Sequence, residues 1–253
     1  MTPSVDTDSI TNWNTASGRI ILVADQVHVW LARLDQPLDR VARCRAILSI
    51  DERNRADRFH FEKDRTAYTV ARAALKSLLG DYLDMPAAEI RFEYSSHGKP
   101  FLPNTANLSE ITFNISHSGG LALLAFAIGR QVGVDVERIR PDFGTLEIAE
   151  RFFSKSEVEV LLAQPADQQS VCFFNCWTRK EAYIKAIGEG LSCPLDRFDV
   201  TLAMNEPARL IETRVASQNA ADWLMHNLEV GPGYRAAIIA EGVDWRLRCW
   251  QYT

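Results

Sequence analysis

The sequence lacks the features that direct a chain into a membrane, along the secretory route or onto nucleic acid. Its longest apolar run, residues 121–128 (LALLAFAI), is far shorter than the roughly 20 residues that span a bilayer. Residues 1–20 do not combine a basic start with an apolar core, as a signal peptide does. The net charge of −5 gives no overall attraction to nucleic acid or to an anionic membrane. We therefore predict a protein that binds neither nucleic acid nor a membrane.

Cysteines are few, odd in number and scattered along the chain. The five of them are Cys44, Cys172, Cys176, Cys193 and Cys249. They have no neighbouring histidine at the spacing of metal ligands, and their odd number does not suit a disulfide framework. We therefore predict reduced thiols in a cytoplasmic protein. Cys172 and Cys176 lie in an apolar helical segment and are expected in the core.

Apolar residues make up 47% of the 253 residues and charged residues 24%, which suits a soluble globular protein of one large or two small domains. Apolar periodicity and turn residues predict the elements. The expected strands are 20–34, 90–95, 111–120, 121–129, 131–139, 198–203, 221–230, 234–242 and 245–253. The expected helices are 49–79, which Gly80 is placed to end, 86–89, 144–151, 154–163 and 168–187.

The chain has a plausible join at residues 129–131. Each side of it contains several expected strands and one prominent helix, which predicts an α+β fold of two similar halves, residues 1–129 and 130–253. Identity between the halves is too faint to define a sequence repeat.

Three acidic residues form a candidate metal site. In GVDVE, Asp135 and Glu137 leave the same face of an expected strand, where two like charges usually require a cation. An exposed strand edge is the simpler explanation of such a pair, and it weakens if Glu181 reaches the same place. Three carboxylates without histidine or cysteine form a hard-oxygen set, which suits Mg²⁺ or, alternatively, Mn²⁺ together with water and a substrate phosphate.

Basic residues accompany these acids. Lys185 follows Glu181 by one helical turn in WTRKEAYIKAIGEGL, where a plain surface pair would contribute only about 0.3–0.5 kcal/mol. Lys99 lies in the turn HGKP, which Pro100 stiffens. The helix expected at 49–79 is also rich in arginine and lysine, most of which suit a solvated face.

A serine and a histidine precede a glycine pair in NISHSGG. Ser116 and His117 end an expected strand, in a loop suited to presenting a hydroxyl and an imidazole to an anion. A hydrolase is the other interpretation, but adjacent residues on an extended chain point apart, and the chain has no G-x-S-x-G elbow. A structural histidine is an equally good account of His117 on this evidence alone.

Five motifs in order carry a resemblance to a known family. GKP, FNISHSG, GVDVE, RFFS and WTRKEAYIKAIGEGL together resemble the 4′-phosphopantetheinyl transferases of the surfactin-synthetase type. The pattern G-[VI]-D-x-E followed by W-x-x-K-E-A-x-x-K is diagnostic of that family, and here Asp135 and Glu181 are 46 positions apart (181 − 135). The resemblance runs from about residue 55 to residue 191.

The resemblance implies an activity and a fold. The family transfers phosphopantetheine from coenzyme A to a serine of an apo acyl or peptidyl carrier protein, and releases adenosine 3′,5′-bisphosphate. Its longer members have two similar α+β halves related by a pseudo-twofold axis, with coenzyme A between them. The length of this chain matches that monomeric form. The resemblance therefore implies a Mg²⁺-dependent monomeric enzyme.

The resemblance also implies roles for individual residues. Asp135, Glu137 and Glu181 would hold Mg²⁺, and Glu181 and Lys185 would act in catalysis. The implied coenzyme A contacts are Arg55, Lys99, Pro100, Ser116, His117, Asp135 and Lys185, with Arg72 as a further candidate. Glu52 stands where some members have a second base, so that contact is in doubt.

The acceptor of the serine proton stays open. Glu157 resembles a position proposed as the general base in some relatives, and a metal-bound water is the alternative; an exposed helix residue is an equally good account of Glu157. Family analogy places carrier recognition near residues 152–162.

Two other classes of protein use the same residues. A binding module would hold coenzyme A or a nucleotide without turnover, and a Mg²⁺-dependent phosphohydrolase would use water as the nucleophile. The sequence does not distinguish among carriers of fatty acid, polyketide and non-ribosomal peptide synthesis.

Overall fold

The computed structural model describes residues 13–103, 110–140, 144–204 and 206–253. Most of the leader that lacks a signal-peptide pattern, residues 1–12, lies outside the described part. The described chain forms two compact units. We call residues 13–130 with 245–253 the first unit, and residues 131–244 the second unit.

The last strand of the chain does not belong to the half in which the expected division at residue 129 places it. Strand β12 (Arg246–Tyr252) pairs in parallel with β2 (Gln26–Arg33) of the first unit, with Trp250 opposite Trp30. The two indole rings stack with centroids 5.2 Å apart. Residues 245–253 therefore belong to the first unit, because their backbone hydrogen bonds are made there.

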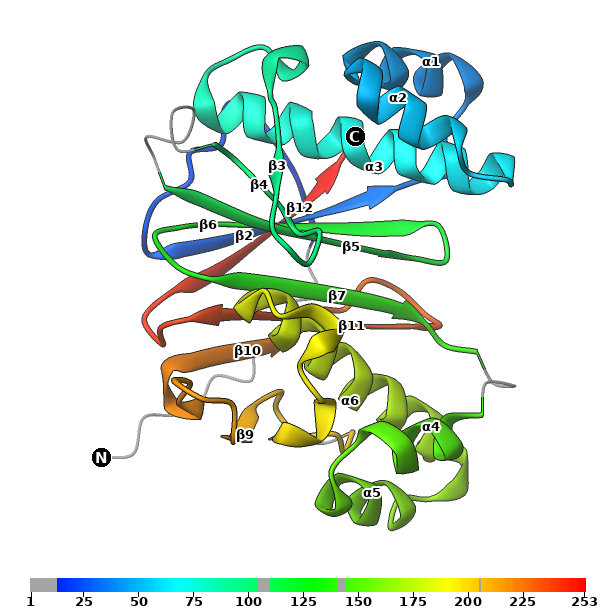
Figure 1. The fold of residues 1–253 in the computed structure, drawn as a ribbon, viewed down its shortest axis with the longest axis vertical. Helices are drawn as coiled ribbons and strands as arrows, with labels where there is room; N and C mark the ends of the chain where they lie inside the picture. Colours follow the sequence, from blue (N-terminus) through cyan, green and yellow to red (C-terminus); the bar gives the residue numbers. More distant parts are fainter. Residues whose placement is uncertain (1–12, 104–109, 141–143, 205) are drawn as a thin grey trace. The chain divides into compact units, whose positions relative to one another are not determined.

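The first unit is built on a five-stranded sheet in the order β1-β12-β2-β6-β5 (Figure 1). Its remaining strands are β1 (Asn14–Thr15), β5 (Ile111–Ser118) and β6 (Leu121–Ile128). Gly119 and Gly120 join β5 to β6, and their φ values of 58° and 90° are those that a two-residue hairpin turn requires. Strand β2 begins at residue 26, six residues later than expected.

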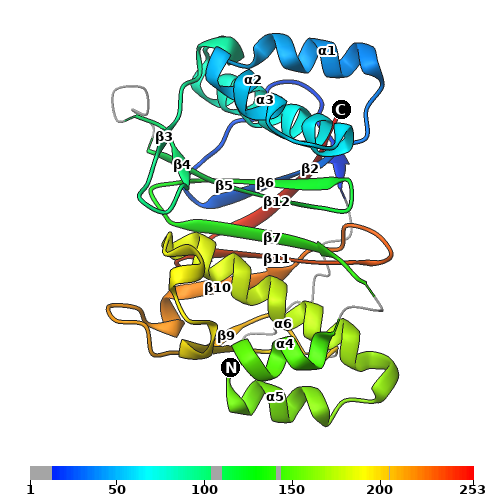
Figure 2. The ribbon, with the colours of Figure 1, turned by 45° about the vertical axis from the view of Figure 1, so that its right-hand side comes forward.

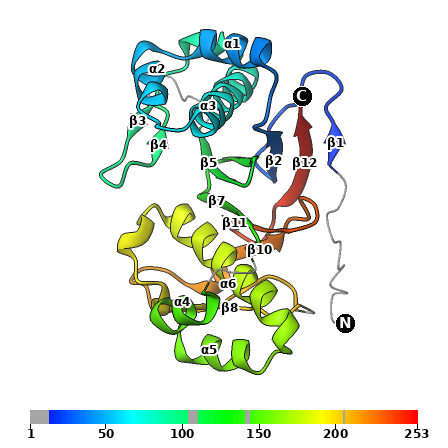
Figure 3. The same cartoon turned by 90° about the vertical axis from the view of Figure 1, so that its right-hand side faces the viewer.

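Three helices cover one face of this sheet (Figure 3). They are α1 (Leu38–Ile47), which the sequence analysis did not predict, α2 (Ile50–Asp57) and α3 (Glu62–Leu83). The single helix expected at 49–79 is thus two helices. The prediction that Gly80 ends it was wrong, because α3 continues to Leu83 and ends at Asp84, whose φ is 57°. Gly80 serves close packing instead: an added Cβ would lie 2.7 Å from the carbonyl oxygen of Met85.

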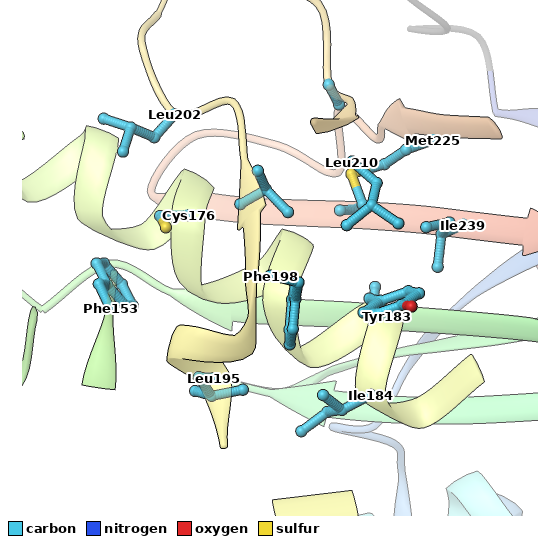
Figure 4. Close-up of a cluster of buried hydrophobic side chains, with 14 of the residues drawn as sticks. Phe153, Cys176, Tyr183, Ile184, Leu195, Phe198, Leu202, Leu210, Met225 and Ile239 are labelled. Carbon is cyan, nitrogen blue, oxygen red and sulfur yellow. The ribbon is translucent and has the colours of Figure 1, made fainter. Parts of the chain in front are cut away.

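The second unit has a three-stranded antiparallel sheet in the order β10-β11-β7. Figure 2 shows α6 lying against this sheet, with α4 and α5 beyond it. The elements are β7 (Val132–Arg138), α4 (Thr145–Phe152), α5 (Lys155–Leu162), α6 (Ala166–Ile187), β8 (Phe198–Val200), β9 (Leu210–Thr213), β10 (Trp223–Asn227) and β11 (Tyr234–Glu241). Its core packs around α6 and includes Cys176, Tyr183 and Phe198 (Figure 4). Cys172 is buried there as well, so the predicted burial of both cysteines is confirmed.

The two units follow the same path through their central elements. In each, a strand is followed by three helices and then by an antiparallel pair, in the order β2-β6-β5 in the first unit and β7-β11-β10 in the second. The predicted α+β class is therefore confirmed. A pseudo-twofold relation between the units stays a prediction. Within the described residues, no helix is both long and apolar enough to cross a membrane.

Candidate active site

The carboxylates of β7 face α6 because a glycine lets strand and helix approach closely. A Cβ added to Gly133 would lie 2.0 Å from the carbonyl oxygen of Ala182 and 2.5 Å from the amide nitrogen of Ala186. Asp135 and Glu137 follow Gly133 by two and four positions, so their side chains leave the same face of the strand. The alternating valines of β7 are buried on the opposite face.

Lys185 of α6 contacts an aspartate of β7. Its Nζ donates to Oδ1 of Asp135 at 2.6 Å, with the Lys185 side chain 27% exposed and that of Asp135 3% exposed. The sequence spacing suggested a pair within the helix, between Glu181 and Lys185. The ion pair between Lys185 and Asp135 joins the helix to the strand, which fixes both side chains at one site.

Glu181 lies one helical turn before Lys185 and belongs to the same electrostatic cluster. Burial raises the pKa of Glu181 to about 7. The Lys185 ammonium opposes this shift, while the carboxylates of Asp135 and Glu137 add to it. The structure therefore brings the three predicted acids and the predicted lysine together, whereas an exposed strand edge would leave Asp135 in solvent. We name this set (Asp135, Glu137, Glu181 and Lys185) the acid cluster.

The donor chemistry of the acid cluster fits a hard divalent cation. All the anionic groups are carboxylates, and Mg²⁺ commonly uses one or two carboxylates and completes its octahedron with water and substrate phosphate. In the part of the chain that the structure describes, no three His, Cys, Asp or Glu side chains are gathered closely enough to hold an ion by themselves. Lys185 instead lies on Oδ1 of Asp135.

Lys99 and Pro100 lie in a short hairpin of the first unit. Strands β3 (Glu93–Tyr94) and β4 (Pro100–Phe101) pair with Tyr94 opposite Pro100, where a longer strand at 90–95 was expected. Ser95 Oγ accepts from the backbone amide of Lys99 at 3.1 Å and so holds the turn. Burial lowers the pKa of Lys99 to about 8. An anion that binds beside this ammonium would stabilise its charged form and so raise its pKa.

Arg55 of α2 and Arg72 of α3 lie on the same tyrosine. Their guanidinium carbons are 5.6 Å and 5.7 Å from the ring centroid of Tyr68. Nη2 of Arg72 donates to the hydroxyl of Tyr94 at 3.0 Å. Since Tyr94 pairs with Pro100, this contact joins the two predicted arginines to the hairpin that carries Lys99. The first unit therefore brings four of the eight predicted coenzyme A contacts, Arg55, Arg72, Lys99 and Pro100, into one region.

Ser116 and His117 lie at the end of β5, next to the glycine turn. Ser116 is buried and His117 is exposed, as expected for neighbours on a strand that point to opposite faces. Only His117 is presented to solvent, so the two side chains do not form a serine–histidine pair of the hydrolytic kind.

Glu157 is a structural residue in this fold. It is 3% exposed, and its Oε2 accepts from the amide of Ser154 at 2.9 Å and from Nζ of Lys180 at 2.7 Å. Its Oε1 accepts from the amide of Val200 at 2.9 Å. Both oxygens are therefore engaged, which argues against the implied role of Glu157 as general base, and its burial corrects the alternative of an exposed helix residue.

Glu52 is likewise buried and engaged. It forms a capping box with Ser49 at the start of α2, and its Oε2 accepts from Nζ of Lys76 at 3.1 Å. The sequence analysis missed Lys76, Tyr68 and Tyr94 as members of this region. The motif S-x-x-E, present as SIDE at residues 49–52 and as SKSE at residues 154–157, is the signal that would have indicated the structural roles of Glu52 and Glu157 as capping residues.

The described geometry defines a class of protein. The second unit holds a cluster of carboxylates with a lysine, and the first unit holds two arginines beside the hairpin that carries a lysine. Such groups suit an enzyme that handles a phosphorylated substrate, because phosphate transfer depends mainly on positioning and on charge stabilisation.

Comparison with known proteins then gives the family. A family model described as 4′-phosphopantetheinyl transferase superfamily matches residues 131–239, and one described as 4′-phosphopantetheinyl transferase, N-terminal, matches residues 37–128. The chain is similar to 4′-phosphopantetheinyl transferase HetI of Nostoc sp., with 38% identity over 240 residues that cover 95% of this chain and 98% of that protein. It is 33% identical over 214 residues to 4′-phosphopantetheinyl transferase Sfp of Bacillus subtilis, covering 84% and 91%.

The chain therefore belongs to the 4′-phosphopantetheinyl transferase superfamily, and the resemblance drawn from its motifs is confirmed. Among solved structures, it matches a holo-(acyl-carrier-protein) synthase from Bacillus anthracis in complex with coenzyme A, with a TM-score of 0.35 and 18% identity. That match covers 45% of this chain and 96% of the other.

Proposed function

We propose that this protein transfers 4′-phosphopantetheine from coenzyme A to a serine of an apo acyl or peptidyl carrier protein, and releases adenosine 3′,5′-bisphosphate. The observation that carries the proposal is the acid cluster, in which Lys185 lies 2.6 Å from Asp135 while Glu181 and Glu137 share its electrostatic field. The cluster lies within residues 131–239, which match the family.

Asp135, Glu137 and Glu181 would hold Mg²⁺ in this proposal. The ion would neutralise charge on the pyrophosphate of coenzyme A. Lys185 supplies a cation at the same place. Its partial exposure leaves the ammonium accessible to a phosphate oxygen, which would stabilise the charge that develops on the leaving group.

Residues of the first unit would bind coenzyme A. Arg55, Arg72, Lys99 and His117 provide positive or hydrogen-bonding groups for its phosphates. Burial lowers the pKa of Lys99, and a bound phosphate would raise this pKa again, because it favours the charged ammonium. Ser116 and Pro100 would shape the loops that carry these groups. The serine proton needs an acceptor other than Glu157, whose oxygens are engaged in the fold.

Intact-mass spectrometry of an apo carrier protein tests the activity. The carrier is incubated with the enzyme, coenzyme A and Mg²⁺, and we expect a gain of one phosphopantetheine. Glu181→Gln and EDTA should each abolish the gain, while Glu89→Gln, at an exposed acid of the first unit, should leave it intact. Carriers from fatty acid, polyketide and peptide synthesis are assayed in parallel.

The same experiment separates the alternatives. Release of adenosine 3′,5′-bisphosphate without any carrier protein would indicate a phosphohydrolase. Coenzyme A binding without a mass gain on any carrier would indicate a binding module. Either result would overturn the proposal.

We also propose that the enzyme acts as a monomer in the cytoplasm. All five cysteines are free and buried, which supports a reducing compartment. Sedimentation equilibrium tests the oligomeric state, and a concentration-dependent mass above 28.5 kDa would contradict it.

A further inference from the structure

The carboxylate of Glu52 joins two helices of the first unit. Its Oε2 accepts from the amide of Ser49 at 2.8 Å and from Nζ of Lys76 at 3.1 Å, while its Oε1 lies 3.7 Å from Nε of Arg72. One buried carboxylate therefore holds the first turn of α2 and two bases of α3 at once. Glu52 is the only acidic group that the described ion pairs place on Arg72.

Arg72 is held from several sides and keeps one donor unused. It is 8% exposed, and its guanidinium carbon lies 4.7 Å from the ring centroid of Phe92. Nη2 donates to the hydroxyl of Tyr94. Nη1 is buried and makes no hydrogen bond of normal geometry among the residues that the structure describes, and the buried hydroxyl of the neighbouring Tyr68 likewise makes none. A buried charged donor is normally satisfied, so this nitrogen indicates an acceptor that a ligand supplies.

The second unit contains the same arrangement of serine, glutamate and lysine, but without the arginine. We call this arrangement the Ser–Glu–Lys joint: Ser49, Glu52 and Lys76 in the first unit, and Ser154, Glu157 and Lys180 in the second. Ser154 and Glu157 form the capping box of α5, and Lys180 of α6 pairs with Glu157. Lys76 follows Glu52 by 24 positions (76 − 52), and Lys180 follows Glu157 by 23 (180 − 157). The residue four positions before the lysine is Arg72 in the first unit and Cys176 in the second.

This comparison separates folding from function. The Ser–Glu–Lys joint occurs in both units, so it is a property of their shared path of strand and three helices. The arginine occurs in one unit only, where its carboxylate partner also orders α2, the helix that carries Arg55. The fold does not require the arginine, because the second unit packs its joint around a buried thiol instead.

We propose that Glu52 is a positioning residue for coenzyme A, holding Arg72 so that its free Nη1 faces a phosphate group of the substrate. The inference rests on the proposed function. Arg55 and Arg72 both lie against the ring of Tyr68, so the orientation of α2 relative to α3 sets the separation of the two guanidinium groups. Glu52, the residue that stands where some family members have a base, therefore contributes through the arginine beside it.

Steady-state kinetics of Glu52→Gln test this role. The variant keeps the shape of the side chain and removes its charge. We expect KM for coenzyme A to rise about tenfold, with kcat within twofold of the wild type. A misplaced Arg72 weakens substrate binding but takes no part in the transfer step. Arg72→Met should give a similar rise. The double variant should be no worse than Arg72→Met alone, since Glu52 acts through Arg72.

Ser49→Ala is the matched control. It removes the hydroxyl that accepts from the amide of Glu52 and weakens the start of α2, but leaves the Glu52 carboxylate in place. We expect a lower melting temperature and an unchanged KM for coenzyme A. A Glu52→Gln enzyme with wild-type KM, or fully additive effects in the double variant, would overturn the inference. A wild-type enzyme without transfer activity would instead overturn the proposed function.

Discussion

Lys185 has two roles: its ammonium pairs with the buried carboxylate of Asp135, and in the proposed reaction it stabilises charge on the phosphate. We expect Lys185→Met to lower kcat for transfer about 100-fold, because a cation beside the reacting phosphate is lost. The variant also leaves Asp135 buried without its ammonium, which should lower the free energy of unfolding by about 1–3 kcal/mol. Urea denaturation and single-turnover transfer measure the two effects. Arg43→Met, at an exposed base of α1, is the control, and an equal loss in both variants would contradict the assignment.

His28 sets a pH limit on the stability of the first unit. It is fully buried, with Nδ1 2.9 Å from the hydroxyl of Tyr82 and Nε2 3.0 Å from Oε1 of Gln26. Oε1 of Gln26 can only accept, so Nε2 of His28 carries the proton, and Nδ1 accepts from the Tyr82 hydroxyl, which itself accepts from Trp30 at 2.8 Å. Burial, with a smaller effect of Arg248, lowers the pKa of His28 to about 4.

This shift predicts acid sensitivity. Between pH 6.5 and 4 the unfolded chain binds a proton at His28 that the folded chain does not, so stability falls as pH falls through this window. The pKa difference corresponds to a loss of about 3 kcal/mol in the free energy of unfolding at pH 4 and below, and to no loss above pH 6.5. Unfolding free energies of the wild type and His28→Gln, measured from pH 7.5 to 4, should diverge in slope in that window. Parallel curves would contradict the prediction.

At the scale of elements, the capping box of α5 holds that helix to α6 and β8. Glu157 accepts from Ser154, from Lys180 and from the amide of Val200, and so links three elements through one carboxylate. We expect Glu157→Gln to lower the free energy of unfolding by about 3 kcal/mol, because Lys180 keeps its charge in the core without a counter-ion. Chemical denaturation measures the loss. A large fall in kcat at unchanged stability would instead restore Glu157 as a general base.

Elements with a strong local pattern are those that the sequence predicts well. The strands at β5, β6 and β7 and the helices α4, α5 and α6 were expected within a few residues, because alternation or amphipathic periodicity runs through each of them. Helix α1 and strand β9 were missed. Gly80 was read as a stop signal because its role in close packing depends on a contact with Met85 that local sequence does not reveal.

The candidate site was predictable in its members but not in its contacts. The motifs gave Asp135, Glu181 and Lys185, and the structure brings them together. Lys185, however, donates to Asp135, fifty positions away, as well as acting on the charge of Glu181, one turn away. Helical spacing reports only which residues share a face, whereas the close approach that Gly133 permits decides which element lies opposite.

At the scale of the whole molecule, the C-terminal strand closes the first unit rather than extending the second. Strand β12 lies between β1 and β2, and Trp250 stacks on Trp30 and meets the ring of His28 edge-on at 4.5 Å. Removing this indole takes away packing from the centre of that sheet, so Trp250→Ala should destabilise the first unit by about 2–4 kcal/mol.

Hydrogen–deuterium exchange distinguishes the two units. In Trp250→Ala, amides of β2 and β6 should lose protection, whereas those of β7 and β11 should keep theirs, because the second unit has its own core around α6. Trp223→Ala, at a buried indole of β10, is the reciprocal control and should affect β7 and β11 first. A uniform loss of protection across both units would mean that the chain unfolds as one cooperative block, with the C-terminal strand stabilising both units together.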